Sequence, residues 1–241
     1  GKYFSTVYSV RTTVQNFLLA QFYSIFGDIL FFAVLEFRSP NFQAGWPTFS
    51  FIICLILLLI MGLLIALHFI LLQKYQTIKH QQPEKLSEFT EKHKGNHVLF
   101  NDYKDFSLVR QSFLVLLTGR ELIFSLFLTT MFDHPLAESI LILILNLLMI
   151  SYLLFKAPFK EAIDAMQQLF YEIIVLLVSI SVLIMVAMDS IDSKGSDIRN
   201  FLGRFVIGLN FCFNFGSLGF MMLKGYQSCR ELYKNYKNRE L

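Results

Sequence analysis

The sequence predicts an all-α integral membrane protein, a polytopic transmembrane helical bundle of about six spanning helices, and three observations support this fold class. Residues 49–72 form a stretch of 24 residues without a formal charge, longer than the ~18 residues that indicate a spanning helix. Hydrophobic residues make up 55% of the 241 residues, more than a single soluble core needs. The Lys and Arg residues gather in alternate connectors.

Six apolar stretches are each about long enough to cross a bilayer. In chain order they cover residues 17–36, 49–72, 112–132, 136–155, 169–188 and 201–223. The first carries Gln21 and Asp28, and the second carries no charge. Pro and Gly residues break the chain after the first stretch, and Asp133-His134-Pro135 leaves room only for a tight hairpin after the third.

The basic residues predict how these spans are oriented. Residues 1–16, 73–111, 156–168 and 224–241 hold most of the Lys and Arg, whereas the opposite loops keep Arg38, Lys194 and Arg199. Cytoplasmic loops of membrane proteins are enriched in basic residues. We therefore expect both ends of the chain in the cytoplasm.

The segments outside the spans differ in character. Residues 1–16 are expected to form an interfacial lead-in, and residues 73–111 a cytoplasmic connector with an interfacial helix near 98–110, where aromatic and charged residues mix. Residues 156–168 predict a short amphipathic segment at the inner surface, and residues 224–241 a basic tail. Because the chain begins at Gly1 without a cleavable signal pattern, we expect an upstream extracellular region of the same polypeptide.

Polar side chains at mid-depth are the most informative residues, because an ionisable group in hydrocarbon is unfavourable unless it faces a partner or water. Asp28 and Arg120 lie at similar depth with opposite charge, which predicts a buried ion pair. Such a pair could fix helix packing or line an ion path. Asn146, Asn210 and Asn214 lie at the same depth and form a candidate polar path.

The sixth stretch has two kinds of small and polar positions. Gly208, Cys212 and Gly216 recur every fourth residue and predict a helix-packing stripe. Asn210 and Asn214 are expected roughly opposite that stripe, facing either a pore around a central axis or another helix of the bundle.

Several function classes lack support. The sequence contains no HExxH, GxSxG, GxxxxGK[ST] or GxGxxG motif, so we expect no enzyme, no catalytic residues and no cofactor. His93 and His97 have no third ligand beside them, so no metal site is predicted. No basic stripe adjoins a nucleic-acid module, which argues against nucleic acid as a partner. The lipid bilayer is the expected partner, with self-association or a larger membrane complex possible.

Residues 99–159 resemble the membrane region of TRP-like (transient receptor potential-like) proteins related to polycystins, of the fungal and ciliate type. In that family an LY…Y+ lead-in precedes a span with a central Arg, and a Pro-Phe step follows the next span. Here Leu99-Phe100 and Tyr103-Lys104 match the lead-in, Arg120 matches the central Arg, and Pro158-Phe159 matches the step. The resemblance covers about a quarter of the chain.

The resemblance implies a cation channel, in the plasma or ciliary membrane. Asp189, Asp192 and Asp197 could then form an outer acidic vestibule, or simply be solvated. Lys224, Arg230 and Lys234 in the tail could bind lipid headgroups. The connector between the last two spans is shorter than the roughly 20 residues of a pore helix and filter. A non-conducting membrane anchor for a large extracellular or ciliary surface protein or filament is the alternative.

Overall fold

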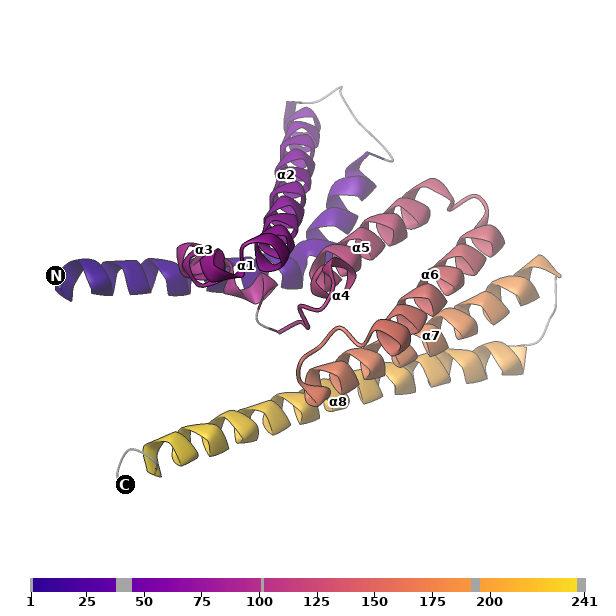
Figure 1. The fold of residues 1–241 in the computed structure, drawn as a ribbon. Coiled ribbons are helices and arrows are strands. Elements are labelled where there is room, and N and C mark those ends of the chain that lie inside the picture. The colour runs from indigo at the N-terminus through magenta and orange to yellow at the C-terminus, as the bar shows by residue number, and fades with distance from the viewer. Residues whose placement is uncertain (1, 38–44, 101, 192–195, 238–241) are drawn as a thin grey trace. The chain divides into compact units, whose positions relative to one another are not determined.

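The computed structural model describes residues 2–37, 45–100, 102–191 and 196–237, in two compact units (Figure 1). The first unit is Gly1–His134 with Pro158–Lys160, and the second is Pro135–Ala157 with Glu161–Leu241. Every element of the described residues is a helix, apart from one isolated antiparallel bridge between Tyr103 and Phe159. The all-α fold class is confirmed.

Six helices are long and apolar enough to span a membrane. Their spanning portions are Val10–Glu36, Gly45–Gln81, Phe113–Thr130, Pro135–Lys156, Ala162–Ser190 and Asp197–Arg230. Each overlaps one of the six predicted stretches, so the predicted number of spans is confirmed within the described residues. At most 22% of the most apolar window of any span is buried, which leaves most of each helix surface to face lipid or another chain.

The first unit consists of three long helices and a connector of short ones. Helix α1 (Lys2–Glu36) packs against α2 (Gly45–Gln81) and α5 (Phe113–Thr130). The connector contains η1 (Pro83–Lys85), α3 (Leu86–Lys92), η2 (Lys94–Leu99) and α4 (Leu108–Gln111). The residues expected as a lead-in, 1–16, belong to α1 from Lys2 onward, because no helix-breaking residue separates them from the first span.

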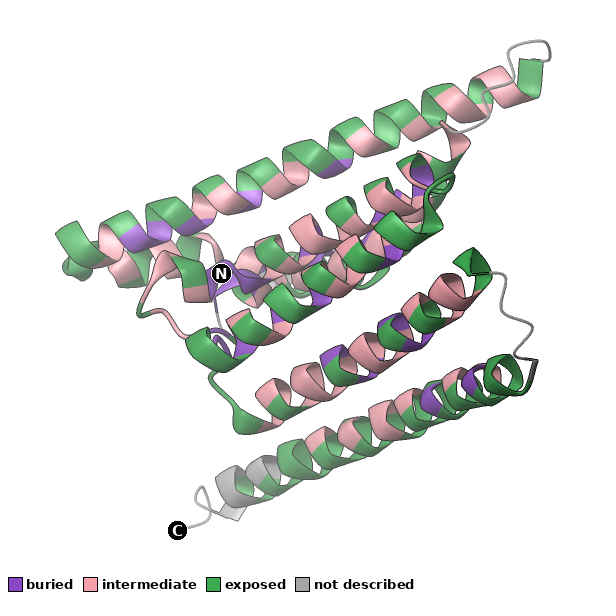
Figure 2. Cartoon of the chain, turned by 90° about the vertical axis from the view of Figure 1, so that its right-hand side faces the viewer, coloured by how far each residue is buried: buried purple, intermediate pink, exposed green. Residues whose placement is uncertain are grey.

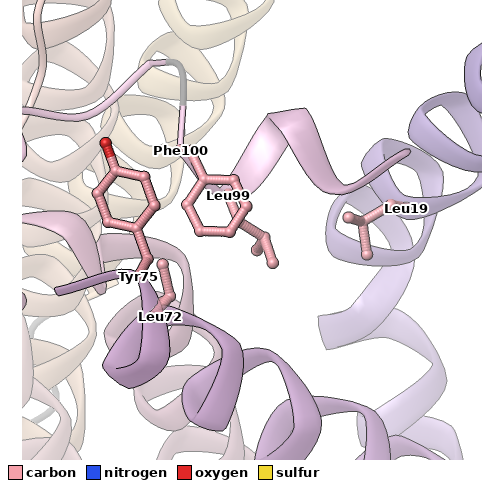
Figure 3. Close-up of a cluster of buried hydrophobic side chains, with 5 residues drawn as sticks. All are labelled: Leu19, Leu72, Tyr75, Leu99 and Phe100. Atoms are coloured by element: carbon pink, nitrogen blue, oxygen red, sulfur yellow. The ribbon is translucent and has the colours of Figure 1, made fainter. Parts of the chain in front are cut away.

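Two apolar clusters hold the first unit together. Phe26 and Leu30 of α1 are buried against Met61 of α2. A second cluster joins α1, α2 and η2, and Figure 3 shows its five buried side chains. They are Leu19, Leu72, Tyr75, Leu99 and Phe100. In this second cluster the rings of Tyr75 and Phe100 stack with their centroids 4.9 Å apart.

The expected interfacial helix near 98–110 takes a different form. Helix η2 ends at Leu99, and α4 begins only at Leu108. Ser107 starts this short helix, because its side-chain oxygen accepts a hydrogen bond from the Arg110 backbone N–H at 3.4 Å. The connector therefore crosses residues 102–107 without a helix.

The second unit is a layer of three helices. Helix α7 (Ala162–Ser190) packs against α6 (Pro135–Lys156) and α8 (Ser196–Lys237). Ala157 ends α6 with a left-handed φ of 42°, and Pro158 cannot continue the helix. The amphipathic segment expected at 156–168 is not a separate helix, because residues 162–168 are the first turns of α7. The basic tail likewise continues α8 as far as Lys237.

Candidate functional site

The Pro-Phe step and the Tyr-Lys lead-in lie together in the first unit. The Lys104 N–H donates to the Pro158 carbonyl at 2.6 Å, and the Lys160 N–H donates to the Asp102 carbonyl at 2.9 Å. We call residues 102–104 and 158–160 the clasp. Tyr103 and Phe159 are buried here with Phe113, at ring-centroid distances of 4.7 to 5.5 Å. Apolar burial and two backbone hydrogen bonds thus join segments about 55 residues apart in the chain.

A polar network lies where the connector meets the end of α2. Gln76 Nε2 donates to Gln111 Oε1 at 2.6 Å, and the Lys79 ammonium forms an ion pair with Asp105 at 2.7 Å. The Tyr75 hydroxyl donates to the same carboxylate at 3.3 Å. We call Tyr75, Gln76, Lys79, Asp105 and Gln111 the Asp105 network. The hydrogen bond from Lys79 is the main reason why the pKa of Asp105 lies below its usual value.

The sequence did not predict the Asp105 network. Gln76 and Gln111 are 35 residues apart, and only the fold brings them together. Gln111 is 1% exposed, and its Nε2 has no hydrogen-bond partner within the described residues. Nothing in the sequence marked these Gln and Asp residues as partners of one another, because Gln and Asp near the end of a span usually face water.

Arg120 pairs with its neighbour in sequence. Its Nη2 donates to Glu121 Oε1 at 2.8 Å, and the two side chains are 15% and 29% exposed. Glu121 in turn lies against α1, where a Cβ on Gly27 would be 3.1 Å from Glu121 Oε2. The side chain of Asp28 is exposed, so the expected buried pair of Asp28 with Arg120 is corrected. The reason is rotational, since Asp28 lies about 100° further around α1 than Gly27.

The three asparagines of the candidate polar path fall on different surfaces. Asn146 of α6 is 2% exposed, and its Nδ2 donates to Ser179 Oγ of α7 at 2.7 Å. Asn210 and Asn214 lie on exposed surface of α8, where Asn214 Nδ2 donates to Asn210 Oδ1 at 3.3 Å. Asn146 therefore joins two helices within the second unit, and only the other two asparagines remain candidates for a polar path.

Two further polar groups are buried within the units. Glu172 of α7 is 2% exposed and accepts a hydrogen bond from Gln168 Nε2 at 2.9 Å. His68 of α2 is 7% exposed, and its Nδ1 lies 2.7 Å from the Tyr23 hydroxyl of α1. The sequence alone did not indicate which helix each of these two side chains faces.

The predicted packing stripe on α8 holds at one of its three positions. A Cβ on Gly216 would collide with the ring of Phe170 of α7, whereas Gly208 has nothing within 4 Å and Cys212 is exposed. The helix repeats every 3.6 residues, so positions four apart drift by about 40° each. Gly216 reaches α7, and Gly208 and Cys212 have rotated away from it.

The outer acidic residues and the tail show mixed outcomes. Asp189 forms an ion pair with Arg199, Asp197 is exposed, and Asp192 lies outside the described residues. A pair with Arg199 reduces the negative field of Asp189.

In the tail, Lys224 Nζ forms an ion pair with Asp164 of α7 at 2.6 Å. Arg230 is exposed, and the side chain of Lys234 is outside the described part of the chain.

These observations define the chain as an integral membrane protein with six candidate helical spans. No protein-family model, curated protein or solved structure matches it.

Proposed function

We propose that the chain is a TRP-like, polycystin-related membrane protein that forms or belongs to a cation channel in the plasma or ciliary membrane. The observation that supports this proposal best is the exposed amide pair of Asn210 and Asn214 on α8. Figure 2 shows that α8, which ends near the C label, is mostly exposed, and none of its apolar spanning window is buried.

The amide pair lies near the middle of the span. At 1.5 Å per residue, Asn210 is about 20 Å from Asp197 at one end, and Asn214 is about 24 Å from Arg230 at the other. One hydrogen bond between the amides satisfies one donor and one acceptor. The remaining amide hydrogens and the Asn214 oxygen need partners that lipid cannot supply. Several copies of α8 around a water-filled axis would supply both water and neighbouring amides.

The experiment is a recording of cation current from the reconstituted chain under voltage, calcium and membrane stretch. The double variant Asn210→Leu, Asn214→Leu should abolish the current, because it makes the proposed pore wall apolar. The control Phe211→Leu changes an exposed apolar residue next to Asn210 and should keep the current. Wild-type current that survives the double variant would contradict the role of α8.

One observation favours the second candidate, a non-conducting anchor for a large extracellular or ciliary surface protein. Helix α7 ends at Ser190 and α8 begins at Ser196. Five residues cannot form a pore helix and filter of roughly 20 residues. If the chain is an anchor, no current should be recorded under any stimulus. The substitutions of Asn210 and Asn214 should then weaken only the association between copies of the chain. A cation current from the wild-type chain would exclude it.

A further inference from the structure

We propose that a groove between α1 and α2 binds a linear diammonium chain, in which each of two carboxylates of α1 holds one ammonium group. This site goes beyond the proposed function, since it lies within the first unit and does not depend on conduction. The groove is an open cavity of about 640 Å³. Its polar lining comes from Asp28, Glu36, Ser50 and Cys54.

Both carboxylates of the groove are available to a cationic ligand. Neither Asp28 nor Glu36 has an ion pair or hydrogen bond from its side chain to another described residue. Asp28 lies within a spanning segment, where an ionised carboxylate is unfavourable without a counter-charge. Glu36 is the last residue of α1, at the end of the same candidate span.

The spacing of the carboxylates selects the shape of the ligand. Eight residues separate Asp28 from Glu36, which is about 12 Å along the helix axis. A single inorganic ion cannot contact two groups this far apart, because metal–oxygen distances are about 2–2.6 Å. An extended diamine with eight methylene groups has its two ammonium groups at a similar separation. A diamine with four methylenes reaches about half as far.

The wall between the carboxylates matches the middle of such a chain. It is formed by apolar residues, among them Ile29 and Phe32 of α1 and Leu57 of α2. Methylene groups that leave water for this surface add favourable hydrophobic burial. The Ser50 hydroxyl and the Cys54 thiol come from the facing α2. The combination of two distant carboxylates with an apolar wall favours a diammonium chain over a simple cation as the ligand of this groove.

The test measures the binding of three amines to the complete chain in discs of uncharged lipid, by calorimetry. Diaminooctane should bind at least about tenfold more tightly than diaminobutane or octylamine, because only diaminooctane makes both charged contacts. Asp28→Asn and Glu36→Gln should each lower its affinity about tenfold and leave octylamine affinity changed by less. The matched control Asp133→Asn removes an exposed carboxylate in the hairpin after α5 and should have no effect.

Three outcomes would overturn the proposal. Equal affinities for the three amines on the wild-type chain would show that two-point recognition is absent, and this result requires no variant to fold. Unchanged diaminooctane binding in both carboxamide variants would place the site elsewhere. Displacement of diaminooctane by calcium ions at equal concentration would identify a site for inorganic cations. None of these binding outcomes depends on channel current, so they are separate from the outcomes that test the proposed function.

Discussion

Asp105 connects the segment between α2 and α5 to the end of α2. Its carboxylate accepts from Lys79 at 2.7 Å and from Tyr75 at 3.3 Å. Such contacts stabilise the charged form, and this is why the pKa of Asp105 is lowered. The lowered pKa of Asp105 therefore depends on the folding of the first unit.

The lowered pKa predicts an acid-sensitive contribution to stability. A carboxyl with a depressed pKa in the folded state stabilises it above the ordinary value of about 3.9, and this contribution is lost as the pH falls through the lowered value. The side chains of Lys79 and Asp105 are 27% and 33% exposed. Solvent screening therefore limits the contribution of this ion pair to the free energy of unfolding to under about 1 kcal/mol. Asp105→Asn should flatten the decline in unfolding free energy below about pH 4, measured by denaturant titration in micelles.

Asp133→Asn provides the control for that measurement, since Asp133 is exposed in the hairpin after α5. It should retain the wild-type dependence on pH. Lys79→Met should reproduce the effect of Asp105→Asn, because it removes the main cause of the lowered pKa. If both Asp105→Asn and Lys79→Met follow the wild-type curve, the ion pair does not contribute to stability.

The position of a residue along its helix could be predicted, but the direction of its side chain could not. The position of Arg120 in its span follows from counting residues between apolar boundaries. Its pairing with Glu121, rather than with Asp28, depends on the rotation of α1 against α5. Neighbours in a helix seldom face each other, so sequence spacing alone favoured the more distant carboxylate.

At the scale of elements, the contact between α7 and α8 depends on one glycine. The ring of Phe170 occupies the space that a side chain on Gly216 would need. Gly216→Ala should therefore destabilise the chain by about 1–3 kcal/mol. Gly208→Ala is the matched control, because nothing lies within 4 Å of its added Cβ. It should be neutral or stabilising by up to about 1 kcal/mol.

The measurement is unfolding of the intact chain by denaturing detergent. Combining Gly216→Ala with Phe170→Leu should recover part of the lost stability, since the smaller side chain leaves room for the methyl group. Equal stability of the two alanine variants would mean that α8 does not pack on α7 as described.

The existence of each long helix was predictable, whereas its ends were less so. Predominantly apolar stretches of about 20 residues have few alternatives to a spanning helix. The ends run further, since α2 continues to Gln81 and α8 to Lys237. Polar residues such as Lys and Gln support helices as well as apolar ones do, so the change in hydropathy marked the edge of the span and not the end of the helix.

At the scale of the whole molecule, an even number of spans returns the chain to the side where it started. The distribution of Lys and Arg leads us to expect that side to be the cytoplasm. Tags placed before Lys2 and after Lys237 should both be protected from a protease outside sealed cells and cleaved after permeabilisation. Tags on opposite sides would exclude six spans.

The clasp also has a consequence for biosynthesis. Residues 158–160 belong to the first unit although α6 precedes them in the chain. When the ribosome has completed α5, the aromatic partner of Tyr103 and Phe113 has not yet been made. The contacts of Tyr103 and Phe113 with Phe159 therefore cannot form until the whole of α6 has been synthesised, roughly one to five seconds later.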